Sequence, residues 1–455
     1  MAEKNSVGAQ PAEPAASAKG TYGRGAAVLS VGIGVTGLIT FGYFALASHS
    51  LPEGEYGGIT LLWSAIFITV SVLYRPVEQL LSRTIADRDA RNIHGTEHLR
   101  VAGTIQLGLG VLFAAVALAL RGRLQDKLFN GSETLYWVLI VAVLAYAASY
   151  FARGYLAGNR RFVLYGGLVL MEASSRFLFA LLVTVGIASG QAFVALGMAA
   201  APILSLAVVP AAFARRAGSG QRAAGSDQGL SADYLDAAAR DEPSAKEPEF
   251  TLARGGGFAA AVLLIMLCEQ TFLNAGPLLV KAGEGARGAA LAGFAFNVLL
   301  IARAPLQLFQ AIQTSILPHL TRLDAGGESD PFRRSVNLTL RAIAGFAGAV
   351  SLGMLVAGPF AMKLVFGGNT HYDRLGLVLV SIGMGLYLSA ATLNQALLAR
   401  GRAGTSAACW LATAAGFVAF LLARVTDDRV LQVEVGYLGA ALVLSSLLYT
   451  IYRRG

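Results

Sequence analysis

RFVLYGGLVLMEASSRFLFALLVT, residues 161–184, is the stretch of sequence that decides the fold. It is long enough to cross the hydrocarbon core of a bilayer as one helix, which takes roughly 20 mostly apolar residues. Glu172 and Arg176 lie in its middle, one helical turn apart and therefore on the same face. A charge at the centre of a membrane helix costs roughly 2.5–3.5 kcal/mol, so it persists where it meets an opposite charge or a polar cavity. The stretch predicts a membrane helix with polar chemistry in its interior.

The composition of the whole chain is that of a membrane protein. Hydrophobic residues make up 55% and charged residues 14% of its 455 residues, and the mean hydropathy is +0.59. These values exclude an ordinary soluble domain. We expect an all-α integral membrane protein with about twelve transmembrane helices. The predicted spans are residues 25–48, 57–80, 101–120, 134–155, 161–184, 191–213, 256–280, 288–312, 341–362, 375–398, 404–423 and 434–452.

Two polar segments set the domain organisation. Residues 1–24 are rich in Ala, Pro and Ser, and we predict a disordered cytoplasmic tail there rather than a signal peptide. Residues 214–255 lack the bulky apolar side chains of a folded unit and are predicted to form a cytoplasmic linker. An N-terminal lobe, 25–213, and a C-terminal lobe, 256–455, then hold six helices each.

The two lobes share a faint sequence similarity. The run RPVEQL at 75–80, in the second predicted helix, has a counterpart in RAPLQL at 303–308, in the eighth. Pro76 and Pro305 each remove a backbone hydrogen bond, which either shapes the packing or allows the helix to move. Internal repeats of this kind are typical of transporters built from two bundles related by pseudo-symmetry.

The distribution of basic residues predicts the orientation in the membrane. The N-terminus, the even-numbered loops and the C-terminus hold about 24 of the 36 Lys and Arg residues, which places both termini in the cytoplasm. The cytoplasmic loop after the fourth helix is predicted to contain Arg153, Arg160 and Arg161. One loop on the outer side is an exception to this rule, with Arg121, Arg123 and Lys127.

Charged residues inside the predicted helices are the candidates for substrate binding. For Arg75, which lies near the cytoplasmic end, snorkelling to the lipid headgroups is the simpler explanation. Glu172 and Arg176 form either a structural ion pair or a pair that opens to receive an anion. The complete candidate set for the substrate is Arg75, Glu78, Glu172, Arg176, Arg303 and Gln307.

Glu269 is the only acid deep in the seventh predicted helix, and Asn274 follows it on the same helix. A desolvated carboxylate could exchange a proton, and an acid beside an amide could bind Na⁺. Glu269 could equally pair with one of the membrane arginines. We therefore name Glu269 and Asn274 as candidate residues for a coupling ion, H⁺ or Na⁺.

Cofactor and metal sites are not expected. The run GIGVTG at 32–37 matches a dinucleotide fingerprint, but it lies within a predicted membrane helix and no strand precedes it. His94 and His98 are four residues apart in a polar loop, which favours a solvated loop over a metal site. Cys268 and Cys409 each lie in an apolar segment, where they are expected to pack without forming a disulfide.

Enzymatic activity and nucleic-acid binding are also not expected. The outer loop that contains Glu53 and Glu55 spans only about eight residues, too few to build a reaction chamber. The net charge of +9 is dispersed over short loops rather than gathered on one face, so topology explains it better than nucleic acid does.

Three segments resemble a known family. YRPVEQLLSR at 74–83, ARGYLAGNRRF at 152–162 and MEASSRFLFALLV at 171–183 are similar to bacterial polysaccharide-biosynthesis membrane proteins of the oligosaccharide flippase family. That family belongs to the multidrug/oligosaccharidyl-lipid/polysaccharide exporter superfamily. The resemblance implies two six-helix lobes around a cavity that opens alternately to each side of the cell membrane.

The same resemblance implies a polyprenyl-diphosphate-linked oligosaccharide as the substrate. Its diphosphate would meet Arg176 and Arg303, while its lipid tail stays among the membrane lipids. Three alternatives stay open: a cation-coupled multidrug exporter, a lipid II flippase, and a non-transporting scaffold for glycan-assembly enzymes. The flippase is favoured because the three membrane arginines suit an anionic substrate.

Overall fold

The computed structural model describes residues 15–90, 95–159, 161–210, 252–285, 288–301, 329–367 and 372–454. Within these ranges the regular elements are all helices. In the N-terminal half they are α1 Ala15–Ser50, α2 Glu53–Leu73, α3 Arg75–Ala90, α4 Glu97–Ala119, the π-helix η1 Arg123–Leu128, α5 Glu133–Gly158, α6 Phe162–Thr184, α7 Gly190–Ser205 and the 3₁₀ turn η2 Leu206–Val208. In the C-terminal half they are α10 Leu252–Glu284, the helix Gly288–Ile301, α12 Ser329–Phe366, α13 Arg374–Ala399, α14 Ala403–Leu422 and α15 Arg429–Arg454.

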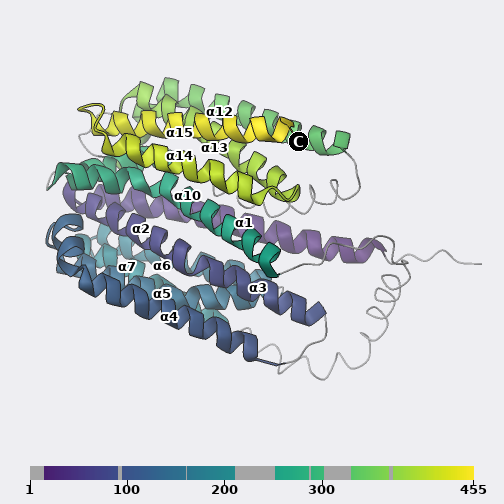
Figure 1. The fold of residues 1–455 in the computed structure, drawn as a ribbon. Coiled ribbons are helices and arrows are strands. Elements are labelled where there is room, and N and C mark those ends of the chain that lie inside the picture. Colours follow the sequence, from purple (N-terminus) through teal and green to yellow (C-terminus); the bar gives the residue numbers. More distant parts are fainter. Residues whose placement is uncertain are drawn as a thin grey trace, which may run out of the picture.

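The helices form two bundles that lie side by side (Figure 1). In the N-terminal lobe α6 packs on α1 and α7, and α5 packs on α3 and α7. In the C-terminal lobe α13 packs on α12 and α15, and α14 packs on α10 and α15. Ten helices of the described chain are long and apolar enough to cross a membrane. The prediction of an all-α membrane protein built from two helical bundles is confirmed.

The second predicted helix is longer than hydropathy indicated. Instead of ending at residue 80, the helical path continues from α2 into α3 and reaches Ala90. The two meet at Tyr74, whose N–H still bonds to Val70 at 2.9 Å. Pro76 lies just beyond this point and has no N–H to donate, which explains why the helix is interrupted there.

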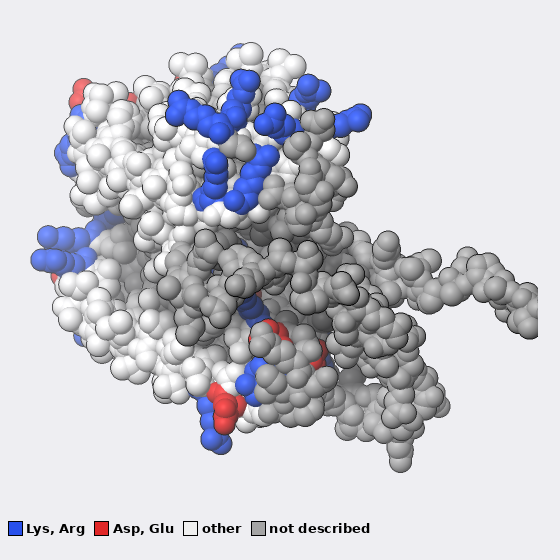
Figure 2. Space-filling model, turned by 45° about the vertical axis from the view of Figure 1, so that its right-hand side comes forward, with Lys and Arg blue, Asp and Glu red and all other residues white. Residues whose placement is uncertain are grey.

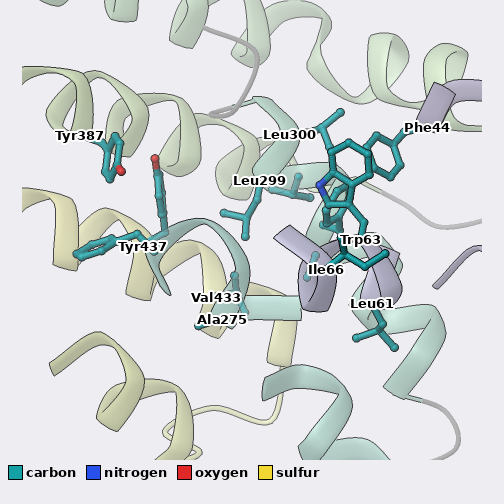
Figure 3. Close-up of a cluster of buried hydrophobic side chains, with 14 of the residues drawn as sticks. Phe44, Leu61, Trp63, Ile66, Ala275, Leu299, Leu300, Tyr387, Val433 and Tyr437 are labelled. Carbon is teal, nitrogen blue, oxygen red and sulfur yellow. The ribbon is translucent and has the colours of Figure 1, made fainter. Parts of the chain in front are cut away.

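The lobes touch through an apolar core and a close backbone contact. Phe44 on α1 packs on Trp63 of α2, with ring centroids 4.9 Å apart (Figure 3). It also packs on Phe296 of the C-terminal lobe, with ring centroids 4.6 Å apart. A Cβ atom on Gly57 would lie 1.8 Å from the carbonyl oxygen of Ala289. Only glycine allows α2 and the helix Gly288–Ile301 to approach so closely.

Basic side chains gather at one end of the bundle. α1 begins and α15 ends at the same end, which we call the terminal end; the opposite end is the far end (Figure 1). Figure 2 looks toward the terminal end and shows basic side chains gathered on the C-terminal lobe. The exposed arginines of α12, α14 and α15 at this end include Arg333, Arg334, Arg402, Arg453 and Arg454. The predicted cytoplasmic linker, 214–255, lies almost wholly outside the described residues, as does the predicted tail before Ala15.

Candidate functional site: a buried charge cluster

Five charged residues lie close together inside the N-terminal lobe. We call them the N-lobe charge cluster: Arg75, Glu78, Arg153, Glu172 and Arg176. They come from α3, α5 and α6, and both α3 and α6 pack on α5. The structure thus brings together four of the six residues predicted to bind substrate, and adds Arg153.

Glu172 is the centre of the cluster. Its Oε1 accepts hydrogen bonds from Arg176 Nη1 at 2.8 Å and from the Tyr146 hydroxyl at 2.7 Å. Its Oε2 forms an ion pair with Arg153 Nη2, and the Ser149 hydroxyl lies 3.5 Å away. The side chains of Glu172 and Arg176 are 3% and 5% exposed. One buried carboxylate is therefore shared between two arginines, which satisfies its desolvated oxygens.

Aromatic side chains hold the Arg176 guanidinium in place. Its Cζ lies 5.1 Å from the centre of the Trp63 ring and 5.8 Å from that of Phe67, both on α2. A cation over an aromatic face gains electrostatic stabilisation in an apolar setting. Nη1 also donates to the Tyr146 hydroxyl at 2.7 Å. Arg176 is thus fixed toward the interior of the lobe and does not extend to the lipid headgroups.

Glycines on α5 allow the cluster to form. A Cβ atom on Gly154 would lie 2.9 Å from the backbone oxygen of Glu78, and one on Gly158 would lie 2.7 Å from Cβ of Ile85. α3 and α5 are therefore in backbone contact, as small residues permit between membrane helices. This contact puts Arg153, the neighbour of Gly154, beside Glu78. The Tyr165 hydroxyl of α6 donates to Glu78 Oε1 at 3.1 Å and closes the group.

Arg153 is the site residue that the sequence analysis missed. It was counted among the basic residues of the loop after the fourth helix, close to the end of the predicted span 134–155, but α5 continues to Gly158 and the Arg153 side chain is only 11% exposed. That prediction is wrong because the residue faces Glu172 of the next helix. The sequence did contain a clue to this role. A membrane carboxylate paired with one arginine has a second oxygen that needs a donor, and Arg153 is the only Lys or Arg within residues 133–158.

Arg75 connects the cluster to the other lobe. It is half-buried at the start of α3, and its charge interacts with those of Glu78 and of Glu269 on α10. The charge of Glu269 therefore acts on Arg75 from the other lobe, and pairing with a membrane arginine was one of the two roles considered for it. Asn274 instead bonds within α10, with Nδ2 3.2 Å from Gln270 Oε1. Arg303 and Gln307 lie outside the described residues.

At the far end the lobes are joined by a second polar group. The Tyr56 hydroxyl on α2 donates to Asn297 Oδ1, and Asn297 Nδ2 lies 3.2 Å from the Tyr372 hydroxyl. Burial raises the pKa of Tyr372 above its usual range, although the bond to Asn297 opposes this, so the phenol stays neutral. The Lys281 ammonium of α10 donates to the side chain of Asn130 in the N-terminal lobe. Together with the Gly57 contact, these bonds close the lobes against each other at the far end.

Glu434 is a second buried charge that sequence patterns did not reveal. It lies in the second turn of α15 and is 5% exposed. Its carboxylate packs directly on Gly376 of α13, where an added Cβ would come within 2.1 Å of Oε2. The charges of two other acids, Asp428 and Asp373, act on this carboxyl group. No group of three His, Cys, Asp or Glu in the described ranges is arranged to hold a metal.

Comparison with known proteins agrees with this architecture. No protein-family model matches the chain, and no curated protein does. Among solved structures, the inward-facing conformation of a multidrug resistance MATE family transporter of the MOP superfamily matches with a TM-score of 0.64 and 14% identity, over 92% of this chain and 94% of that one. The chain has the MATE transporter fold.

Two further MATE structures extend the comparison. The multidrug transporter DinF-BH, solved with a bound dye, matches with a TM-score of 0.63 and 12% identity over 98% of both chains. An outward-facing conformation of a MATE transporter matches less well, with a TM-score of 0.58 and 14% identity over 94% of this chain and 95% of that one. At such low identity the likeness concerns the fold.

Proposed function

We propose that this protein is a transporter that moves an anionic amphiphile across the cell membrane by alternating access between its two lobes. The N-lobe charge cluster is the observation that carries the proposal. It holds three arginines and two glutamates, so one positive charge in excess lies buried in the lobe. A polyprenyl-diphosphate-linked oligosaccharide is the substrate that suits it, because a diphosphate supplies the missing negative charge.

The hydrogen-bonding capacity of the cluster supports an anionic ligand. Arg153 Nε and Arg176 Nε are both buried and make no hydrogen bond within the described chain. Arginine presents several donors in a planar fork that suits phosphate oxygens. Both guanidiniums share Glu172 and therefore keep donors in reserve. A diphosphate would compete with Glu172 for them.

The electrostatic attraction between Arg75 and Glu269 supports alternating access. The two residues belong to different lobes, so their attraction depends on how the lobes are arranged. When the lobes part, Arg75 loses its partner and the N-terminal lobe exposes its excess positive charge. The cluster would then attract an anion most strongly in the open arrangement, in which the anion can enter between the lobes.

The orientation follows from the charges of the two ends. The terminal end is taken as cytoplasmic, since basic residues gather there (Figure 2). Export from that side would carry negative charge outward, which an inside-negative potential favours by about 2.3 kcal/mol per charge per 100 mV. The closed far end then faces the outside. In this orientation the structure corresponds to the inward-facing state of the transport cycle.

A cation-coupled multidrug exporter is the second candidate, and the structurally similar proteins favour it. Those proteins are described as multidrug transporters, and one was solved with a dye. Glu434 adds to this case, because a buried acid with no cationic partner in the described chain could bind H⁺ or Na⁺.

Deletion of the gene, followed by analysis of extracted lipids, tests the proposal. Polyprenyl-diphosphate-linked oligosaccharide should accumulate on the cytoplasmic side, and the intact protein should reverse this. Arg176→Gln and Arg153→Gln should fail to do so, whereas Arg334→Gln, which removes an exposed arginine, should succeed. Unchanged lipid-linked sugar together with new sensitivity to cationic dyes would refute the flippase and establish the exporter.

A further inference from the structure

The far end carries basic residues that topology does not explain. Outer loops are usually poor in Lys and Arg, yet Arg121, Arg123 and Lys127 lie in or beside η1 at this end. The charge of Arg121 is balanced by an ion pair with Glu133, at 3.0 Å. Arg123 and Lys127 form no hydrogen bond or ion pair with the described residues. Their charges are available for a ligand.

Arg123 and Lys127 line a cavity of about 620 Å³ that lies between the two lobes. Its N-lobe wall comes from η1 and the turn after it, and its C-lobe wall comes from the end of α10. The complete lining is Arg123, Asp126, Lys127, Leu128, Asn130, Leu278, Lys281, Ala282 and Gly285. Three cations face one acid, so the lining carries a net charge of +2. The size is within the roughly 300–1,000 Å³ usual for small-ligand sites.

Lys281 is a buried cation in the lining of this cavity. The residue is only 1% exposed, although lysine is almost never buried without a partner. Its ammonium donates to Asn130 of the other lobe and to the backbone oxygen of Gly285. The deepest cation of the cavity is thus also a link between the lobes.

We propose that this cavity binds a phosphate group from the outer side and thereby stabilises the closed far end. The chemistry is that of a phosphate held by Arg123, Lys127 and Lys281. Because both lobes contribute to the lining, the site is complete only while they are together. A ligand that binds one arrangement alone, at 100 times its dissociation constant, shifts the equilibrium by about 100-fold. The inference depends on the cavity and not on which substrate is transported.

Distance measurements between the lobes test the linkage. Thr134→Cys on α5 and Asp427→Cys before α15 are exposed positions at the far end, one on each lobe. Spin labels there, with Cys268→Ala and Cys409→Ala, report lobe separation by pulsed electron resonance. Pyrophosphate added to the detergent-solubilised protein should increase the population with the shorter distance. Nanodiscs of phosphatidylglycerol give the same readout for a lipid phosphate with a net negative charge, and nanodiscs of zwitterionic phosphatidylcholine, whose phosphate is balanced by choline, are the control.

Matched variants decide the outcome. Arg123→Gln combined with Lys127→Gln should weaken binding at least about tenfold and abolish the distance shift. Lys363→Gln combined with Arg374→Gln removes two exposed cations from helix ends of the C-terminal lobe and should change neither. A response to pyrophosphate alone identifies a soluble anion, and a response to phosphatidylglycerol alone identifies a lipid. No response to either, or an equal response in the first double variant, overturns the proposal.

Discussion

Replacing Glu172 by Gln tests whether the N-lobe charge cluster is held together by its shared carboxylate. The change keeps the shape of the side chain but removes the charge that faces Arg153 and Arg176. Removing one member of a buried ion pair typically costs about 3–5 kcal/mol, because it leaves an uncompensated buried charge. Here two arginines lose their partner together. We therefore expect a loss of at least about 3 kcal/mol, more than a 100-fold change in the ratio of folded to unfolded protein.

The assay is unfolding by sodium dodecyl sulfate in dodecyl maltoside micelles, followed by circular dichroism. Glu133→Gln is the matched control, since its ion pair with Arg121 has side chains 63% and 47% exposed. Exposed pairs contribute only about 0–1 kcal/mol. A second variant, Glu172→Gln with Arg153→Gln, should recover part of the loss, because it removes one of the two unpaired cations.

A result in which Glu172→Gln costs no more than Glu133→Gln would contradict the structure of the cluster. The arginines would then be solvated or paired elsewhere. If transport were also lost in that case, the carboxylate would act in the transport cycle without stabilising the fold. Recovery in the double variant distinguishes charge repulsion from a loss of packing.

Further predictions concern helix contacts and topology. Gly57→Val should force α2 away from Ala289 and lengthen the spin-label distance at the far end, whereas Gly54→Val, with open space around it, should not. Gly154→Ala should push α5 from the α3 backbone and lower the unfolding temperature, while Gly108→Ala on α4 should keep or raise it, since alanine favours a helix. A fluorescent protein fused to the C-terminus should fluoresce, and alkaline phosphatase fused there should be inactive, if the terminal end is cytoplasmic.

Hydropathy located individual helices well where the helix ends together with the apolar segment. The predicted spans 161–184, 375–398 and 404–423 agree with α6, α13 and α14 to within one residue at each end. The pairing of Glu172 with Arg176 was also accessible, since residues four apart share a helix face. The part of α3 beyond residue 80 was missed because hydropathy detects apolar segments, and this part of the helix is polar. A helix can continue through polar residues, because its backbone hydrogen bonds do not depend on the hydropathy of the side chains.

The rest of the site depends on contacts between distant segments. Arg153 and Glu172 are 19 residues apart, and Tyr56 and Asn297 are 241 apart. No periodic pattern marks such pairs, since each residue is unremarkable within its own helix. Glu434 was placed at a helix end because the span was predicted to begin there. α15 instead begins at Arg429, so Glu434 lies inside the helix and against α13.

The arrangement of charges suggests why the cluster and the lobe interface belong to one mechanism. Arg176 and Arg153 are neutralised mainly by Glu172 within their own lobe, and this balance does not change when the lobes move as rigid bodies. Arg75 differs, because part of its compensation comes from Glu269 on α10. Opposite charges across a moving interface attract less as they separate and as water enters. The electrostatic potential of the N-terminal lobe therefore depends on the position of the C-terminal lobe, and the proposed transport of an anion would require such a coupling.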